Sequence, residues 1–382
     1  MKIIYIYPSF KIVGGADRII TQKANYLSEE FGHDVFIITD SQNNHPLFFP
    51  LSPKVKHIDL DINFDIQYKY PLIIRYFIYT YLMYKYKKAL LKLLDYLKPD
   101  IVISTLGREV DFIHQLSIKY CVIGEAHTTR DNIRNIKELL KKGGIHRIAG
   151  TIIKRKINKA ISKLKALIVL NEEEKKVWSD ITTAVVIPNA LTFIPSVQNK
   201  LNNKSIIFVG RLEYEKGVDR LIDVWEILHK KYPDWQLQIY GNGTLKEKIN
   251  RMISQKNLTN LIIHQPINNI SKKYIENSIM VLTSRYEGFG LVLIEAMSCG
   301  LPCVAYNCPY GPKNIIKNGI NGWLIEDGNI QQMADNISLL IENREMREKM
   351  GKNAFLTSQK YNPNHIMQKW ESLFQSLVNQ QQ

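Results

Sequence analysis

A glycine-rich turn accompanied by two carboxylates is the most chemically informative part of the sequence. Residues 284–300 read Ser-Arg-Tyr-Glu-Gly-Phe-Gly-Leu-Val-Leu-Ile-Glu-Ala-Met-Ser-Cys-Gly and come after an apolar run that ends at Thr283. This pattern predicts a strand, a turn and then a helix from about Leu291 that Gly300 ends. Glycines let the backbone approach a ligand closely, and the free amides at a helix start favour an anion. The segment therefore predicts an anion site, suited to a diphosphate.

The two glutamates of this segment extend the prediction. Glu287 and Glu295 are eight residues apart in the sequence, which is about 12 Å if the segment is helical throughout. That span compares with the distance from the sugar hydroxyls of a nucleotide sugar, past its diphosphate, to its ribose. One carboxylate would then hold each end of such a molecule. The alternative is that the glycines only form a turn and that Glu295 is a solvated helix residue.

A second loop carries two cations. Residues 209–217 read Val-Gly-Arg-Leu-Glu-Tyr-Glu-Lys-Gly between a predicted strand and a predicted helix, so Arg211 and Lys216 belong to a loop at the sheet edge. Two fixed cations facing a diphosphate would neutralise the charge that develops as a nucleotide leaves. The strand-end sequence Tyr-Gly-Asn-Gly at 240–243 fits a plain tight turn as well as ligand contact by Gly241.

The first half of the chain gives weaker signals. Gly15, in a glycine pair, lies between the first strand and the first helix, but the full dinucleotide fingerprint is missing. His127 comes after another predicted strand and is expected to point toward the same ligand, although a lone histidine is often structural. Asp59-Leu-Asp61 has the D-x-D form of a metal motif, but it is distant from the other motifs and fails as a calcium loop. We expect no metal site.

Short apolar strands that alternate with helices must position these residues. The predicted strands cover 2–7, 34–39, 55–60, 101–104, 120–125, 166–170, 184–187, 205–210, 235–240, 261–264 and 279–283. The alternation predicts an α/β protein with two parallel-sheet domains in series and ligands at the carboxyl ends of both sheets. We expect a first domain over 1–190, a linker over 191–204, a second domain over 205–360 and a C-terminal helix over 361–382.

Charge is unevenly distributed along this chain. Its 382 residues are 45% hydrophobic and 23% charged, which is typical of a folded protein, and the formal net charge is +15. Residues 69–98 hold seven basic side chains against one acid, and residues 137–165 hold ten against one. Such runs indicate a polyanionic partner: anionic lipid head groups, phosphates or nucleic acid. The first run also contains eight aromatic residues, so it predicts either a membrane-surface helix or a domain helix with an apolar core face and a solvated lysine face.

The chain is expected to be cytoplasmic. Its first seven residues are too short for the apolar core of a signal peptide, and the longest apolar stretch, 72–84, carries Arg75. That stretch falls short of the roughly 18 residues that a spanning helix needs. The four cysteines are interpreted as reduced, partly buried thiols rather than a metal site, because no fourth ligand accompanies the cluster of three.

Taken together, these motifs resemble those of family 4 glycosyltransferases, whose two Rossmann-like domains face each other across a cleft (the GT-B type). The resemblance covers nearly the whole chain and is strongest over 209–325. Glu287 and Glu295 match the family's E-x7-E motif, and residues 299–312 and 318–322 resemble the segments just after that motif in bacterial surface-glycan members. The resemblance also implies that the last helix crosses back to the first domain.

The resemblance implies a hexosyltransferase that retains the anomeric configuration and requires no metal or other cofactor. The donor is expected to be a nucleotide diphosphate sugar, a UDP-sugar by resemblance, that carries a hexose or N-acetylhexosamine. Arg211 and Lys216 would bind the donor phosphates, Glu295 the ribose, and Glu287 the sugar hydroxyls near the reacting carbon. Backbone amides around the donor would come from Gly288, Phe289, Gly290 and Leu291.

The resemblance also assigns residues of the first domain. Gly15 would lie near the phosphates or the acceptor, and His127 beside the donor sugar. The expected catalytic residues are thus Glu287, His127, Arg211 and Lys216. The chain departs from the family in two places: Ala126 separates Glu125 from His127, where relatives often have Glu-His, and Asp17 stands where Glu is commoner.

The expected role is construction of a surface glycan such as capsule, lipopolysaccharide or O-antigen. The acceptor would be a glycan or a lipid-linked glycan, and the basic first domain would attach peripherally to the inner face of an anionic cell membrane. A nucleotide-sugar epimerase of the same fold is the alternative. A nucleic-acid-binding protein is suggested by charge alone, and because no recognised motif supports it we expect no nucleic-acid partner.

Overall fold

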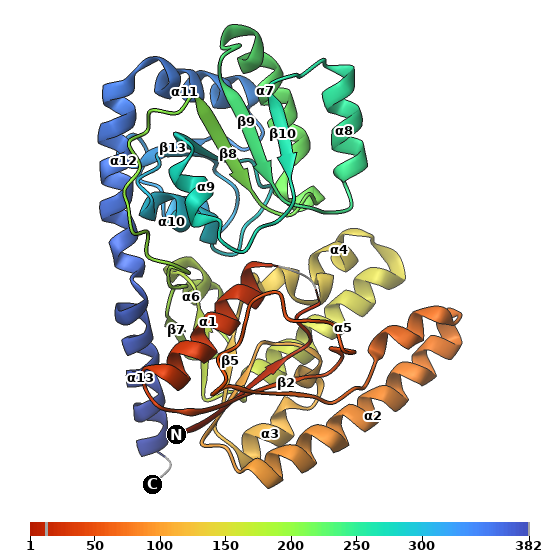
Figure 1. Cartoon of the computed structure of the whole chain (residues 1–382). Coiled ribbons are helices and arrows are strands. Elements are labelled where there is room, and N and C mark those ends of the chain that lie inside the picture. The colour runs from red at the N-terminus through yellow and green to blue at the C-terminus, as the bar shows by residue number, and fades with distance from the viewer. Residues whose placement is uncertain (12–13, 381–382) are drawn as a thin grey trace. The chain divides into compact units, whose positions relative to one another are not determined.

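The chain forms two compact units, each built on one sheet (Figure 1). This computed structural model describes residues 1–11 and 14–380. The first unit comprises Met1–Pro188 and Ile366–Gln382, and the second comprises Asn189–His365. Every strand pair that the structure describes is parallel, which confirms the predicted α/β class.

The first unit has a seven-stranded sheet in the order β3-β2-β1-β4-β5-β6-β7. Each strand lies within two residues of its predicted bounds, because short apolar runs between polar turns mark buried parallel strands clearly. The strands are β1 (Lys2–Tyr7), β2 (Asp34–Thr39), β3 (Lys56–Asp59), β4 (Ile101–Ser104), β5 (Val122–Glu125), β6 (Ala166–Val169) and β7 (Ala184–Val186).

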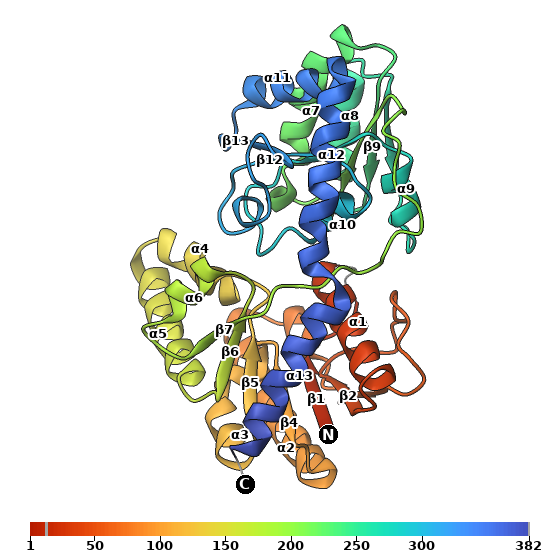
Figure 2. The same cartoon turned by 90° about the vertical axis from the view of Figure 1, so that its left-hand side faces the viewer.

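Helices cover both faces of this sheet. They are α1 (Gly15–Glu29), α2 (Leu72–Leu97), α3 (Ile113–Lys119), α4 (Ile136–Lys141), α5 (Gly144–Ile161), α6 (Glu172–Trp178) and α13 (Pro363–Asn379), with 3-10 turns η1 (Phe64–Lys69), η2 (Arg108–Asp111) and η3 (Arg130–Asn135). Alternate strand residues such as Ile4 and Ile6 join α2, α3 and α5 in one hydrophobic core. Helices α1 and α13 lie together on the other face, where Lys23 contacts Trp370 (Figure 2).

The second unit has a six-stranded sheet in the order β10-β9-β8-β11-β12-β13. Its strands are β8 (Ser205–Val209), β9 (Gln236–Tyr240), β10 (Leu261–His264), β11 (Ile279–Leu282), β12 (Cys303–Tyr306) and β13 (Gly322–Ile325). The last two were not predicted as strands, because four-residue runs inside a motif-rich segment carry little periodicity.

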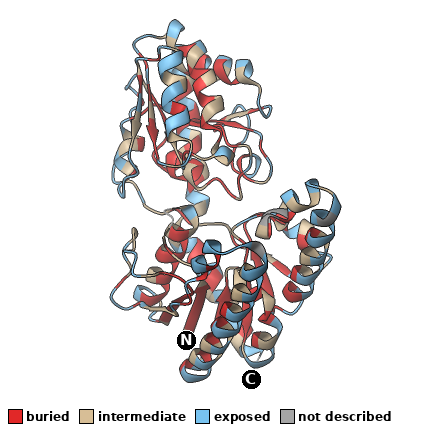
Figure 3. Cartoon of the chain, turned by 90° about the vertical axis from the view of Figure 1, so that its right-hand side faces the viewer, coloured by how far each residue is buried: buried red, intermediate tan, exposed pale blue. Residues whose placement is uncertain are grey.

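Two groups of helices enclose the second sheet. Helix α7 (Val218–Lys231) packs against α8 (Lys246–Gln255) and α11 (Ile330–Glu342), whereas α10 (Leu291–Ser298) packs against α9 (Ser271–Ile275) and α12 (Arg344–Ser358). Short turns η4 (Tyr214–Lys216), η5 (Pro312–Asn314) and η6 (Gln359–Tyr361) complete the unit. The central strands are largely buried, the edge strands β3 and β10 are partly exposed, and most helices are buried on their inner sides (Figure 3).

Each sheet has one position where the strand order reverses. Strand β1 lies between β2 and β4, and β8 lies between β9 and β11. Chain connections leave such a switch point in opposite directions, so the carboxyl ends of its strands are where open parallel sheets bind ligands. Ligand-binding residues are therefore expected at the β1/β4 edge and at the β8/β11 edge.

Neither a membrane span nor an exposed thiol is found in the described part of the chain. Within those residues, no helix combines the length and the apolar character needed to cross a bilayer. The four cysteines are unpaired and buried. Burial raises the pKa of Cys299 and of Cys308 to about 12, so both stay protonated at neutral pH.

Candidate functional site

The glycine-rich turn lies at the β8/β11 edge, between β11 and α10. Gly290 immediately precedes the helix with φ 91°, a left-handed conformation that costs other residues strain. In the first turn of α10 the Leu293 amide donates to the Gly290 carbonyl at 2.9 Å, and a helix start of this kind favours an anion. The helix begins at Leu291, as predicted, and Glu287 lies four residues earlier in the turn, so the 12 Å span calculated for a continuous helix does not apply.

Glu287 is fixed in place by two donors. One carboxylate oxygen, Oε1, accepts hydrogen bonds from Lys216 Nζ at 2.7 Å and from Ser284 Oγ at 2.6 Å. The side chain is largely buried, and Gly311 packs against its Cβ. Ser284 was not among the predicted site residues, although a hydroxyl three residues before the glutamate is a signal that the sequence offered. The structure thus joins the β11 turn to the β8 loop through one ion pair.

The second predicted cation has a different partner. Arg211 Nη2 donates to Glu215 Oε1 at 2.6 Å, and the Arg211 side chain is 44% exposed. Lys216 is less exposed, at 22%. Both cations lie on the loop after β8, as predicted, but only Lys216 contacts Glu287. Arg211 remains on the solvent side of the loop.

Glu295 is a buried residue of α10, so the alternative of a solvated helix position is wrong. It is only 1% exposed. Its two oxygens accept hydrogen bonds from the Thr192 hydroxyl and, at 3.2 Å, from the Tyr274 hydroxyl. Thr192 is 103 positions away in the sequence, a separation that no local pattern signals.

The remaining predicted residues of the second unit have structural roles that the sequence left open. A side chain at Gly241 would collide with the carbonyl of Gly210, so close packing between the two strand-end loops already requires glycine there. Phe289 is buried, and its ring meets that of Tyr361 edge-on with centroids 5.6 Å apart. Gly288 and Leu291 are half-buried at the turn.

In the first unit, His127 belongs to a buried charged cluster at the end of β5. Its Nε2 lies 3.4 Å from Glu125 Oε1, which also accepts from Lys23 Nζ on α1. Lys23 in turn lies 4.0 Å from the centre of the Trp370 ring on α13. Burial lowers the pKa of His127, and Lys23 adds to this while Glu125 opposes it, so the imidazole is neutral at pH 7.

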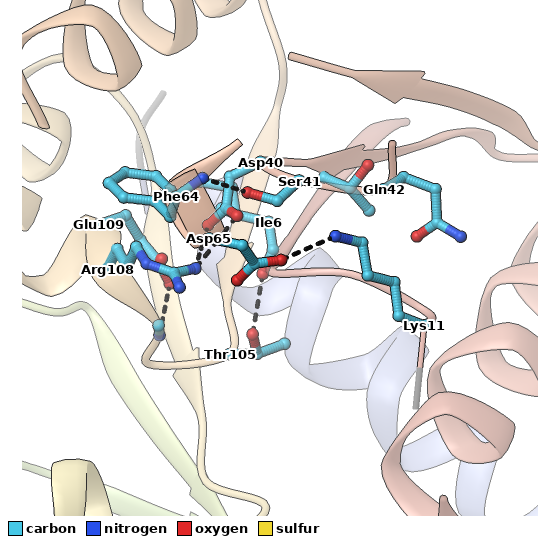
Figure 4. A network of polar contacts seen from close by, with 12 residues as sticks. Ile6, Lys11, Asp40, Ser41, Gln42, Phe64, Asp65, Thr105, Arg108 and Glu109 are labelled. Carbon is cyan, nitrogen blue, oxygen red and sulfur yellow. Dashed lines mark hydrogen bonds and ion pairs between the residues drawn. The ribbon is translucent and has the colours of Figure 1, made fainter. Parts of the chain in front are cut away.

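The β1/β4 edge of the first unit carries a polar network that was not predicted (Figure 4). Arg108, after β4, donates to both oxygens of Asp40, after β2, at 3.1 and 2.9 Å. The same guanidinium lies 4.2 Å from the Phe64 ring centre. Lys11, after β1, pairs with Asp65 at 3.1 Å. Each of these polar residues comes after a strand or lies on η1. Their positions after predicted strands were the one sequence signal that could have indicated this network.

Gly15 and Asp17 begin helix α1 at this same sheet. Gly15 is the first helical residue, preceded by Gly14 in an extended conformation. Asp17 is buried and accepts a hydrogen bond from the Tyr7 hydroxyl at 2.6 Å. Burial, followed by the nearby Asp17 carboxylate, raises the pKa of Tyr7 well above its usual value. The start of α1 is therefore tied to the end of β1.

The D-x-D sequence stabilises a turn. Asp59 accepts hydrogen bonds from Thr39 Oγ1 at 2.9 Å and from the backbone amides of Gln42 and Asn43 at 3.0 and 3.1 Å. Burial alone would raise its pKa, but these hydrogen bonds hold the pKa of Asp59 below its usual value. In the parts of the chain that the structure covers, no three His, Cys, Asp or Glu side chains gather as a metal site.

Comparisons with known proteins agree with this architecture. The family model "Glycosyl transferases group 1" matches residues 190–357. A Haemophilus influenzae protein described as an uncharacterized glycosyltransferase is 31% identical over 381 residues, which cover 97% of this chain and 99% of that protein. A poly(ribitol-phosphate) alpha-N-acetylglucosaminyltransferase of Staphylococcus aureus is 34% identical over 220 residues, 56% of this chain and 45% of the relative.

A solved structure shares the whole fold. A variant of S. aureus TarM, in complex with UDP and other ligands, superposes with a TM-score of 0.77 at 18% identity and covers 98% of this chain and 99% of that one. The near-complete match to the H. influenzae glycosyltransferase confirms the resemblance drawn from the sequence motifs. This chain therefore belongs to the group 1 glycosyl transferases, and it is a glycosyltransferase with the two Rossmann-like sheets of the GT-B class.

Proposed function

We propose that this enzyme transfers a hexose or N-acetylhexosamine from a UDP-sugar, with retention of configuration, to a glycan or lipid-linked glycan during bacterial surface polysaccharide synthesis. The observation that carries the proposal is the partly buried Glu287–Lys216 ion pair at the β8/β11 switch point. The UDP complex of the structural neighbour supports the nucleotide. The relative named for poly(ribitol-phosphate) supports a polymeric acceptor.

In the proposed donor complex, Lys216 and Arg211 bind the diphosphate. Both cations stand on the loop after β8, and the α10 amides face the same edge. Charge builds up on the diphosphate as the bond to the sugar breaks, and two cations with a helix start stabilise that charge. These groups would neutralise the diphosphate charge that a divalent cation neutralises in metal-dependent transferases, so we propose that no metal is required.

Glu287 and Glu295 have separate proposed roles. Glu287 would hold the sugar hydroxyls near the reacting carbon, and its negative charge would favour the positive charge that develops there. Glu295 would accept hydrogen bonds from the ribose hydroxyls. The hydroxyls of Thr192 and Tyr274 donate to its two oxygens and hold the carboxylate in place.

The first unit is proposed to contribute His127 and Gly15. A neutral imidazole has both a donor and an acceptor nitrogen, which suits contact with a sugar hydroxyl. The lowered pKa of His127 supports that neutral form. Gly15, at the start of α1, would lie close to phosphate or acceptor, where a helix start favours an anion.

We also propose that the protein works in the cytoplasm, peripherally attached to the inner face of the cell membrane. The first unit carries the two strongly basic runs, 69–98 and 137–165. Cytoplasmic leaflets are negatively charged, and each lysine or arginine near such a surface contributes about 1 kcal/mol of attraction.

Thermal stability with a panel of UDP-, GDP-, ADP- and CMP-sugars tests the donor assignment. Binding to the native state alone raises the unfolding midpoint, by about 2.7 kcal/mol of stability at a hundredfold excess over Kd. We expect a shift with one UDP-sugar, weakened in Glu295→Ala and in the conservative Glu295→Gln. An equal shift in both variants would contradict the role of Glu295, and a shift with a GDP-sugar only would contradict the nucleotide.

Product analysis tests the reaction class. We expect transfer to an added acceptor with the donor's anomeric configuration, visible by NMR. Steady release of a free, altered sugar without acceptor would instead favour an epimerase. The relatives named as glycosyltransferases do not favour that alternative.

A further inference from the structure

Helix α2 has an exposed apolar side in addition to its buried one. Leu82, Tyr86, Leu90 and Leu94 pack into the core of the first unit. On the opposite side, six large side chains of the first half of the helix are between 48% and 77% exposed: Ile73, Ile74, Tyr76, Phe77, Tyr81 and Tyr84. We call this set the aromatic face. Single exposed apolar residues are ordinary, but a contiguous group indicates a surface that another partner covers.

The charges beside the aromatic face indicate the chemistry of that partner. Lys85, Lys88 and Lys92 are exposed and stand four residues after Tyr81, Tyr84 and Lys88, so they continue the same side of the helix. Helix α2 holds five basic residues and one acid, a net charge of +4. Asp95, the acid, is already paired with Lys119 at 3.2 Å.

Aromatic side chains next to lysines match an anionic bilayer. Tyrosine places its ring among lipid chains and its hydroxyl among head groups, while lysines contact lipid phosphates. A second copy of the chain would bring two faces of the same positive charge together, which is unfavourable. Since the described helices include none that can span a membrane, α2 would lie on the surface and not cross it.

The aromatic face is tied to the ligand edge of the first unit. Turn η1, immediately before α2, is held by the Lys11–Asp65 ion pair and by the Arg108 guanidinium over the Phe64 ring (Figure 4). The backbone amide of Phe64 also donates to Ser41 Oγ at 3.3 Å. Lys11, Ser41 and Arg108 come after β1, β2 and β4. Turn η1 therefore connects the start of α2 to residues at the carboxyl ends of these strands.

We propose that the aromatic face of α2 docks on an anionic bilayer and presents the β1/β4 edge to an acceptor carried on a lipid. The docking rests on the exposed side chains alone. The acceptor part rests on the proposed transferase function. The two parts are tested separately.

Vesicle sedimentation tests the docking. The probes are phosphatidylcholine vesicles with and without phosphatidylglycerol. We expect the wild type to bind only the anionic vesicles. Two triple variants should each weaken that binding by more than about tenfold. The aromatic-face variant is Tyr76→Ser/Phe77→Ser/Tyr81→Ser, and the lysine variant is Lys85→Glu/Lys88→Glu/Lys92→Glu. Matched controls are Ile118→Ser/Leu356→Ser, equally apolar and exposed, and Lys349→Glu/Lys352→Glu on α12, and both should bind like wild type.

Several results would overturn the docking. One is that the wild type fails to bind anionic vesicles. The others are that the aromatic-face variant binds them as well as wild type does, or that the control variants lose as much vesicle binding as the test variants. If sedimentation velocity shows that the wild type is a dimer and the aromatic-face variant a monomer, the surface would be assigned to self-association instead. The altered side chains are exposed, so an unchanged thermal midpoint verifies that each variant is folded.

Two further assays separate this proposal from the proposed function. The nucleotide-sugar shift should be the same in wild type and in the aromatic-face variant, because none of the proposed donor residues lies on α2. A missing shift with intact vesicle binding would contradict the donor proposal and leave the docking standing. Transfer to a vesicle-bound acceptor should fall in the variant while transfer to its detergent-dispersed form is retained. An equal fall in both would contradict the lipid-carried acceptor.

Discussion

Glu287 is held by a cation and a hydroxyl, so its charge is positioned before any substrate arrives. Glu287→Gln keeps the shape of the side chain but removes the charge and leaves Lys216 without its carboxylate. If Glu287 stabilises the transition state, the transfer rate at saturating donor should fall about 10²–10³-fold, the usual effect of losing one preorganised electrostatic group.

The control for that change is Glu276→Gln. Glu276 is an exposed surface residue paired with Lys273, so its neutralisation should leave the rate unchanged. Equal rates for Glu287→Gln and wild type would remove Glu287 from the catalytic residues. A reduced rate with an unchanged donor KM would place its contribution in the transition state.

His127 provides a pH-dependent prediction. Burial lowers its pKa, so between that value and the ordinary value near 6.5 the unfolded chain binds the extra proton. The free energy of unfolding should therefore fall as pH drops below about 6.5, by at most about 1.4 kcal/mol per pH unit for each such histidine. Urea unfolding at several pH values between 5 and 7.5 measures this slope.

His127→Gln should reduce the slope without abolishing it. His57 and His264 also have lowered pKa values, from burial in both cases, and remain in the variant. Glu125 and Lys23 face His127. Burial alone would raise the pKa of Glu125, but Lys23 and His127 outweigh that effect and hold the pKa below its usual value. An unchanged slope in the variant would show that His127 titrates normally in the folded protein.

Among the elements, α1, β5 and α13 meet at one buried ion pair. Lys23 and Glu125 are 5% and 1% exposed. Lys23→Met leaves the Glu125 carboxylate uncompensated in the core, which should cost about 3–5 kcal/mol of unfolding free energy. Lys56→Met, which breaks an exposed pair with Asp34, should change stability little.

The double variant Lys23→Met/Glu125→Gln checks the cause. If the cost comes from an isolated buried charge, removing that charge as well should recover part of the lost stability in urea unfolding. A double variant less stable than Lys23→Met would contradict the isolated Glu125 charge as the cause of the loss.

Elements were predictable where the signal was local. The α10 turn could be located because an apolar run, two glycines and a helix pattern occur in succession within a few residues. The partners of Glu295 could not, since Thr192 is 103 positions away and Tyr274 belongs to another helix. For α2, the sequence left a membrane face and a core face as alternatives. The structure shows that the helix packs into the core on one side and leaves aromatic residues exposed on another, with Tyr86 buried and Tyr84 exposed.

At the scale of the molecule, each unit has its own hydrophobic core, but the first unit includes the last helix. Trp370 and Phe374 of α13 are buried. A chain that ends at His365 should lose hydrogen-exchange protection in β1 and β5, whereas β8 and β11 should keep theirs. Protection of β1 and β5 equal to wild type would contradict this.

A full-length variant covers the case in which the shortened chain does not fold. Trp370→Ala should destabilise the protein by about 3–5 kcal/mol, because a large buried ring leaves a cavity. Exchange should again rise in the first unit alone. A uniform rise over both units would mean that the two cores unfold as one.

The return of α13 to the first unit sets an order of events during synthesis. The ribosome makes Asn189–His365 between the two parts of the first unit, and at about 5–20 residues per second this takes roughly 9 to 35 seconds. During that interval the nascent sheet has β1 to β7 but lacks the helix that places Trp370 beside Lys23. The N-terminal unit is thus the last to be completed, and its uncovered apolar side is where a chaperone would bind the growing chain.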